Sequence, residues 1–311
     1  MLRGLLISKH YRPQFSGHET FPLRQLWLRK AFDAVHQAGG VASKSIFGDP
    51  AAIARFGVGK NMVAAIRHWA LACDVIEETA NGYAIGRVGE IFFGANGLDP
   101  YLEHPASAWL VHWYLAGEGQ RSTTWYWLFN HVTGPMFDRL DVVRGLRNYC
   151  DDVKHSRSSM ATIERDVDTC LRSYAPRSNN AAIEDFVEPV LGELGLISHL
   201  RSSEYTFRIG AKPSLPDGVV LFALARSWAQ FATTANTLSL ETIAYDTGAV
   251  GPVFKLDLDS LAERLARIEQ TSNGAFAWSE TAGLKQVIRR SEVDPFDFLG
   301  GAYGARPRQR H

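Results

Sequence analysis

Two groups of side chains in this 311-residue sequence are of types that could carry out acid–base or metal chemistry. The first is His18-Glu19, with Arg24 close behind. An imidazole and a carboxylate beside a cation could activate water or bind a metal ion, so His18 and Glu19 are candidate catalytic residues. The alternative is a folding role, in which Glu19 lies near a helix start and His18 makes an internal hydrogen bond. One adjacent pair supplies few ligands for a closed metal site, which favours the folding role.

The second group is Asp166 and Asp168, with His155 upstream. These carboxylates are candidate ligands for a divalent metal such as Mg²⁺ or Mn²⁺. Residues two apart on a helix point about 200° from one another, so they do not readily share one ion. The pattern therefore favours surface or ion-paired carboxylates over a metal site.

Other catalytic signatures are absent from the sequence. It contains no Walker A loop and no convincing Asp…Glu-x-Lys nuclease core. Its cysteines have no CxxC spacing, which excludes a thiolate zinc knuckle and a disulfide framework: Cys73, Cys150 and Cys170. No apolar stretch approaches the ~20 residues of a membrane span and no secretory signal precedes residue 10, so we expect a cytoplasmic protein without a membrane partner.

The elements that would position these groups begin with three helices and a hairpin. Thr20 and Pro22 are expected to start a helix that ends at Gly39-Gly40, and Asp49-Pro50 starts a second that ends at Gly57. A third helix carries an apolar stripe of Val58, Met62, Ile66, Trp69 and Cys73. Residues 75–86, with an Asn-Gly turn, predict a β-hairpin. This order is typical of a winged helix-turn-helix.

The third helix would present its polar face to double-stranded DNA. That face is expected to hold Lys60, Asn61, Arg67 and His68, while Arg24, Lys30 and Arg87 would add further contacts. The formal net charge of the chain is zero, but residues 1–70 hold ten Lys and Arg against three Asp and Glu, which is typical of a polyanion-binding module. A solvated helix face and a protein-interaction module are the alternatives.

The whole chain is predicted to be mainly α-helical with small β-hairpin wings and several domains. We expect an N-terminal winged-helix domain over 1–98, a Trp-rich helical region over 99–178, a C-terminal winged-helix-like domain over 179–299 and a disordered basic tail over 300–311. The tryptophans of residues 109–127 and His112 are expected in the core.

Two stretches of the sequence resemble a known family. Residues 15–24, FSGHETFPLR, followed by Trp27-Leu28 and Lys30, look like the opening signature of the SspB-type proteins of single-strand DNA phosphorothioation gene sets. Residues 58–69 resemble the helix-turn-helix of the same family. Asp166-Val167-Asp168 and the segment from Trp278 to Leu284 are weaker matches.

The resemblance implies a DNA-nicking role in phage defence, in which one strand is cut so that sulfur can replace a non-bridging phosphate oxygen. It also implies three partners: a cysteine desulfurase, an ATPase and an enzyme similar to phosphoadenosine-phosphosulfate (PAPS) reductases. Two alternatives stay open, a DNA-binding regulator that recruits partners without cutting and a scaffold that binds other proteins.

Overall fold

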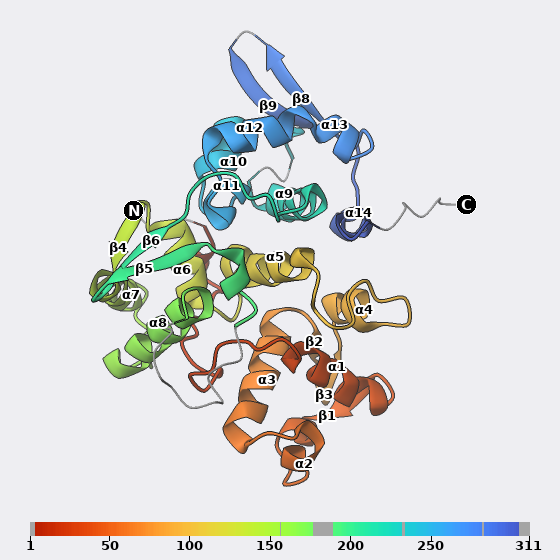
Figure 1. The fold of residues 1–311 in the computed structure, drawn as a ribbon, viewed down its shortest axis with the longest axis vertical. Coiled ribbons are helices and arrows are strands. Elements are labelled where there is room, and N and C mark those ends of the chain that lie inside the picture. The colour runs from red at the N-terminus through yellow and green to blue at the C-terminus, as the bar shows by residue number, and fades with distance from the viewer. Residues whose placement is uncertain (1–3, 156, 177–188, 232–233, 282, 305–311) are drawn as a thin grey trace.

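The computed structural model describes residues 4–155, 157–176, 189–231, 234–281 and 283–304. Within these residues it is mainly helical, with three small antiparallel sheets of three strands each. Figure 1 places the three sheets in separate parts of the molecule, each with its own helices. No helix in the described ranges is long and apolar enough to cross a membrane.

The N-terminal unit, at the bottom of Figure 1, follows the predicted order of helices and hairpin. Gly57 ends the second helix in a left-handed conformation, as predicted. The structure adds a strand that the sequence pattern does not predict, which pairs antiparallel with the last strand of the hairpin. The elements are α1 (Trp27–Gln37), β1 (Val41–Ser43), α2 (Ala52–Phe56), α3 (Lys60–Ala72), β2 (Ile76–Glu78) and β3 (Gly82–Ile85).

The expected start of the first helix is wrong. The helix begins at Trp27, and Leu26 precedes it without a capping side chain. Thr20 does not act as a cap, because Thr20 and Glu19 both have left-handed backbone conformations, with φ of 64° and 49°.

The second unit repeats this order and crosses the boundary expected between residues 178 and 179. Strand β4, from the region predicted to be helical, pairs with β6, and β6 pairs with β5. The division of the chain into folding domains stays a prediction, but this sheet joins residues from both sides of that boundary. The elements are α6 (Thr123–His131), β4 (Met136–Asp138), α7 (Arg139–Asp152), α8 (Met160–Tyr174), β5 (Ile197–Arg201) and β6 (Glu204–Phe207).

The third unit, at the top of Figure 1, has the same strand order, with its first strand paired to its last. Two of its helices, α10 and α12, begin at Leu240 and Leu258. The elements are α9 (Asp217–Phe231), β7 (Thr237–Ser239), α10 (Leu240–Tyr245), α11 (Val250–Phe254), α12 (Leu258–Ala266), α13 (Ile268–Thr271), β8 (Phe276–Thr281) and β9 (Leu284–Arg289).

Three further helices connect or end the units: α4 (Arg87–Phe93), α5 (Pro105–Trp113) and α14 (Leu299–Ala302). The predicted tail is thus helical at its start, and its residues 305–311 lie outside the described residues. Residues 177–188 also lie outside them, and a short 3-10 turn over Gly192–Leu194 precedes the second hairpin.

The core joins the three units around α5. Trp109, Trp113 and Trp125 are buried as predicted, and Trp127 is partly buried. His112 of α5 is fully buried, with Nδ1 2.7 Å from the Tyr174 hydroxyl of α8 and Nε2 2.8 Å from the Val253 carbonyl of α11. The hydroxyl donates to Nδ1 and Nε2 donates to the carbonyl. Burial lowers the pKa of His112 to about 3, so this histidine is a neutral part of the core.

Candidate nucleic-acid interface

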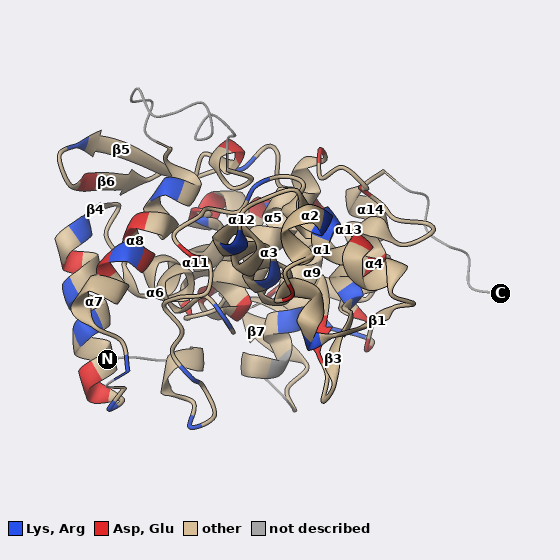
Figure 2. Ribbon diagram, turned by 90° about the horizontal axis from the view of Figure 1, so that it is seen from below, with Lys and Arg blue, Asp and Glu red and all other residues tan. Residues whose placement is uncertain are grey.

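The exposed side of α3 carries most of the polar face predicted for the third helix. Lys60, Asn61 and Arg67 are exposed, while Ile66 and Trp69 on the other side are completely buried. Within the described part of the chain, Lys60 and Arg67 form no ion pair. Figure 2 shows lysine and arginine residues along α3, and also along α7 and α8. The cations of α3 are therefore available to an anionic partner.

The start of α3 is also suited to an anion. Gly59 precedes the helix with extended backbone, and no side chain caps the first amides. Uncapped amides at a helix N-terminus attract phosphate, because the backbone dipoles place positive charge there. Lys60 and Asn61 flank these amides and reinforce the attraction.

The placement of His68 on the exposed face is wrong. Its side chain is only 5% exposed and packs edge-on against Trp69 and His18, with ring centroids 5.0 Å and 5.6 Å away. Burial lowers the pKa of His68 well below its usual value, so the ring is neutral. Its Nδ1 lies 3.4 Å from Nε2 of Gln14 and accepts that amide hydrogen. His68 fixes the N-terminal segment on α3 and is not accessible to DNA.

Three other predicted DNA contacts have partners inside the protein. The Arg24 guanidinium lies over the rings of Phe21 and Trp27, and Lys30 donates a 2.7 Å hydrogen bond to the Phe56 carbonyl. Arg87, just past the hairpin, starts α4, forms an ion pair with Asp294 and lies 3.9 Å from the centroid of Phe296. DNA contacts by these three residues stay predictions.

His18 and Asp166, which the sequence pattern assigns to separate sites, form one buried pair. His18 Nε2 lies 2.5 Å from Asp166 Oδ1, and the two residues are 3% and 2% exposed. The backbone N–H of Thr20 donates to His18 Nδ1 at 3.1 Å, so the ring carries its proton on Nε2 and donates it to the carboxylate. Thr124 donates to the second carboxylate oxygen. Both ring nitrogens of His18 are therefore occupied, which supports the folding role, one of its two interpretations.

The signature segment 15–24 packs around this pair. The His18 ring stacks on Trp69 of α3 with a centroid distance of 5.7 Å and meets Trp125 of α6 at 6.0 Å. Gly17 has φ of 109°, and a Cβ there would lie 2.7 Å from His68 Nδ1. The segment thus needs a glycine before its histidine, and it joins α3 to α6 and α8.

The proposed metal pair, Asp166 and Asp168, does not form a site. Asp168 faces away from Asp166 and accepts two hydrogen bonds from Arg139, of 2.5 and 2.8 Å. The structure confirms that the two carboxylates point apart and that Asp168 is ion-paired, whereas Asp166 is buried instead of lying at the surface. In the residues that the structure describes, no three His, Cys, Asp or Glu side chains are grouped as metal ligands would be.

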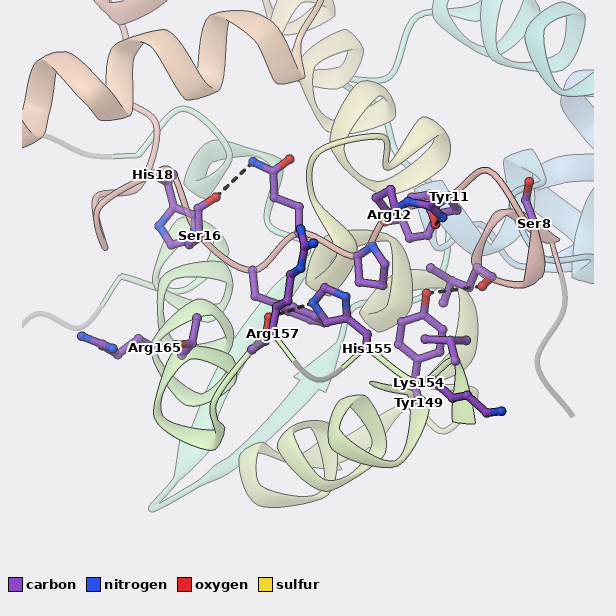
Figure 3. Close-up of a pocket in the computed structure, with 18 of the residues that line it drawn as sticks. Ser8, Tyr11, Arg12, Ser16, His18, Tyr149, Lys154, His155, Arg157 and Arg165 are labelled. Atoms are coloured by element: carbon purple, nitrogen blue, oxygen red, sulfur yellow. Dashed lines mark hydrogen bonds between the residues drawn. The ribbon is translucent and has the colours of Figure 1, made fainter. Parts of the chain in front are cut away.

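A pocket of about 1040 Å³ lies between the N-terminal segment and helices α7 and α8 (Figure 3). Its wall includes one carboxylate, Glu19, which is exposed and has the left-handed backbone noted above. Non-glycine residues held in this conformation are concentrated at functional sites. Five cations line the same pocket: Lys9, Arg12, Lys154, Arg157 and Arg165.

These five cations are exposed, and none of them forms an ion pair within the described residues. The pocket also contains His155, whose Nε2 lies 3.0 Å from the Ser158 hydroxyl. Desolvation and the nearby Arg157 lower the pKa of His155, which keeps the ring neutral near pH 7. The pocket is therefore strongly positive, and one carboxylate and two imidazoles line it, those of His18 and His155.

Sequence reasoning missed the five cations as a group. Lys154 and Arg157 lie in a polar segment that resembles a surface linker, and Lys9 and Arg12 lie about 140 residues earlier. The excess of positive charge near the N-terminus was a partial signal. Only the packing of residues 6–20 against α7 and α8 brings the two segments together.

Comparisons with known proteins agree with the resemblance found in the signature segments. A family model described as "Protein of unknown function (DUF4007)" matches residues 15–303. Two similar solved structures are described as "Magnesium ion-bound SspB crystal structure" and "SspB crystal structure", with TM-scores of 0.82 and 0.81 and sequence identities of 27% and 28%. Each alignment covers 96% of this chain and 91% of the other. No curated protein matches the chain.

The family model covers most of the chain, including the buried His18–Asp166 pair and all three sheets. The two SspB structures share the fold over nearly the full length. The chain therefore belongs to the DUF4007 family and is an SspB-type protein.

Proposed function

We propose that this protein is a DNA-binding and single-strand nicking component of a phosphorothioation system. The observation that carries the proposal is the exposed side of α3, which holds Lys60, Asn61 and Arg67 and begins with uncapped amides. A cationic strip buried inside the protein, or paired with carboxylates, could not bind a polyphosphate surface. In the described residues this strip is exposed and unpaired.

We assign the N-terminal unit as a winged helix with α3 as its recognition helix. Its order of helix, strand, two helices and hairpin, with sheet order β1-β3-β2, supports this assignment. The second and third units have the same strand order, which supports further winged-helix-like units in the C-terminal half. In a helix-turn-helix the last helix enters the major groove, which is the position we propose for α3.

For strand cleavage we propose Glu19 as the acid–base group. It is the carboxylate of the cationic pocket, and it is exposed, whereas His18 beside it is buried with both nitrogens engaged. A carboxylate can accept the proton of an attacking water, and lysines and arginines around it stabilise the charge that develops on the phosphate.

One of the two similar structures is a magnesium ion-bound SspB, so we propose a divalent ion, Mg²⁺ or Mn²⁺, as a cofactor for nicking. The described residues do not form a complete metal cage, because Glu19 has no second carboxylate beside it in the pocket. Magnesium commonly binds through one or two carboxylates together with substrate phosphates.

The proposed partners follow from the family. They are double-stranded DNA, a cysteine desulfurase, an ATPase and an enzyme similar to PAPS reductases. The surfaces of the second and third units would be available to the protein partners while α3 binds DNA.

Supercoiled plasmid provides the test. Purified protein is incubated with plasmid and Mg²⁺ or Mn²⁺, and the products are separated on a gel. We expect open circles that are lost on addition of EDTA or with Lys60→Ala/Arg67→Ala. Lys285→Ala/Arg290→Ala, which removes two cations of the distant third unit, is the matched control and should nick like the wild type.

The alternatives give different results in this assay. A recruiting regulator would shift the mobility of DNA without cutting it, and an interaction scaffold would do neither at low salt. Either result would overturn the nicking proposal, and the absence of a shift would overturn DNA binding as well.

A further inference from the structure

The cationic pocket of Figure 3 differs from the α3 surface in shape and composition. We propose that it binds a short single-stranded stretch of nucleic acid, with the phosphates on its cations and one or more bases against its apolar wall. This inference rests on the proposed function, since it assigns one strand of the same DNA to a second place on the protein.

The cations are distributed along the pocket and do not converge on one point. Figure 3 shows Arg165, Arg157 and Lys154 spread across its width, with Arg12 on the opposite wall. A single phosphate ion would need converging donors, whereas a strand presents its charges in series. A volume of about 1040 Å³ is also at the upper end of what drug-sized ligands occupy, so it has room for several nucleotide units.

The wall of the pocket also has exposed apolar side chains. Ile7 is 60% exposed and Val153 is 38% exposed, whereas Phe15 and Tyr149, which also line the pocket, are only 3% and 2% exposed. Exposed apolar groups between cations suit single-strand binding, because bases can pack on them while the backbone follows the charges. A duplex hides its base faces in the stack, so it cannot use both kinds of group in one pocket.

The start of α8 lies beside this wall. Helix α8 begins at Met160. The pocket lining includes Ser158 just before the helix and Thr162 and Arg165 in its first turns. The Ser159 hydroxyl caps the amide of Thr162, which leaves the amides of Met160 and Ala161 without a side-chain cap. With 15 residues, α8 is long enough for its dipole to favour phosphate at this end.

Fluorescence anisotropy with the full-length protein tests the proposal. The probes are a labelled oligodeoxynucleotide of about 12 nucleotides, an abasic strand of equal length and a blunt duplex. The variant is Lys154→Gln/Arg157→Gln, whose side chains are exposed and free of ion pairs among the described residues. The control is Arg144→Gln/Arg201→Gln, which removes two exposed cations that do not line the pocket.

We expect the pocket variant to bind the single strand at least about tenfold more weakly and the duplex within about twofold of the wild type. The abasic strand should bind the wild type at least about fivefold more weakly than the normal strand, since it keeps the phosphates and loses the stacking. The control variant should behave like the wild type with all three probes.

Three results would overturn the proposal: unchanged affinity of the pocket variant for the single strand, an equal loss for single strand and duplex, or equal binding of normal and abasic strands. Displacement of the strand by poly-glutamate at equal charge concentration would instead indicate an acidic protein segment as the ligand, and would also overturn it.

Lys60→Ala/Arg67→Ala separates the two proposals, because it should weaken duplex binding and leave the single strand unaffected. Duplex binding that does not depend on α3 would contradict the proposed function alone.

Discussion

His18 donates a hydrogen bond to Asp166 across 148 positions of the sequence, and both side chains are almost completely buried. The pair attaches the signature segment to α8, while stacking of His18 on Trp69 attaches it to α3. One residue of the signature thereby connects the first and second units of the protein.

Removal of one partner from this pair should destabilise the fold. His18→Ala leaves the buried carboxylate of Asp166 with Thr124 as its remaining side-chain partner, and loss of one partner of a buried pair typically costs about 3–5 kcal/mol. Urea denaturation measures the free energy of unfolding. Glu19→Gln, at the exposed neighbour, is the control and should stay within about 0.5 kcal/mol of the wild type. Equal stability of His18→Ala and wild type would show that the pair contributes nothing to folding.

Glu19→Gln should affect cleavage instead of stability. Loss of a general acid–base group typically lowers the rate by about 10²–10⁴-fold. We expect this reduction in the plasmid nicking rate, with duplex affinity and melting temperature unchanged. A nicking rate near that of the wild type would remove Glu19 from the chemistry.

Gly17→Ala should destabilise the protein more than Gly39→Ala. Both glycines have positive φ, but a Cβ at position 39 would meet no atom within 4 Å, whereas one at position 17 would press on His68. The backbone strain is about 1–2 kcal/mol at either site, and we expect the contact with His68 to add to it at position 17. Thermal unfolding of the two variants gives the comparison, and equal melting temperatures would contradict the close packing of Gly17.

The stability of the protein should fall in acid because of His112. Its pKa is 6.5 in the unfolded chain and about 3 in the folded protein, so the unfolded state binds more protons between these values. The contribution of neutral, buried His112 to the free energy of unfolding is fully present above pH 6.5 and is lost as the pH falls towards 3. In His112→Gln the decrease should be shallower, although buried His68 and partly buried His131, whose pKa values are also lowered, keep part of it. Free energies of unfolding measured from pH 7 to 4 test this, and identical slopes would count against it.

Lys60→Ala/Arg67→Ala should change how DNA binding responds to salt. Each lost phosphate contact lowers the slope of log affinity against log salt by about 1, so the double variant should lose about 2. Duplex titrations at several salt concentrations give the slope. An unchanged slope would mean that α3 does not contact the backbone of DNA.

The sequence predicted the local elements of the N-terminal unit well. The apolar positions of α3 and the turn residues of the hairpin are determined by neighbours in the chain, and Ile66, Trp69 and Cys73 are buried as expected. The sequence pattern placed His68 on the exposed face of α3, next to Trp69 in the chain. In the structure the His68 ring is covered by the segment around His18, 50 residues away. Helical periodicity cannot reveal a contact with a segment so far away in the sequence.

The contacts within the candidate site were harder to predict from the sequence than the local elements. His18 and Asp166 were both singled out, but each was paired with a neighbour in the sequence, because their contact depends on how α8 packs. Short strands such as β1 and β4, three residues each, carry too few positions for an alternating pattern to be visible.

The attachment of Gln14, Gly17 and His18 to α3 has a mechanical consequence. The same residues form part of the pocket wall, so the pocket and the proposed recognition helix α3 are both in contact with this segment. A tilt of α3 as it enters a groove of DNA would move the segment and alter the width of the pocket. We therefore expect duplex binding by α3 to change the space available to a separated strand.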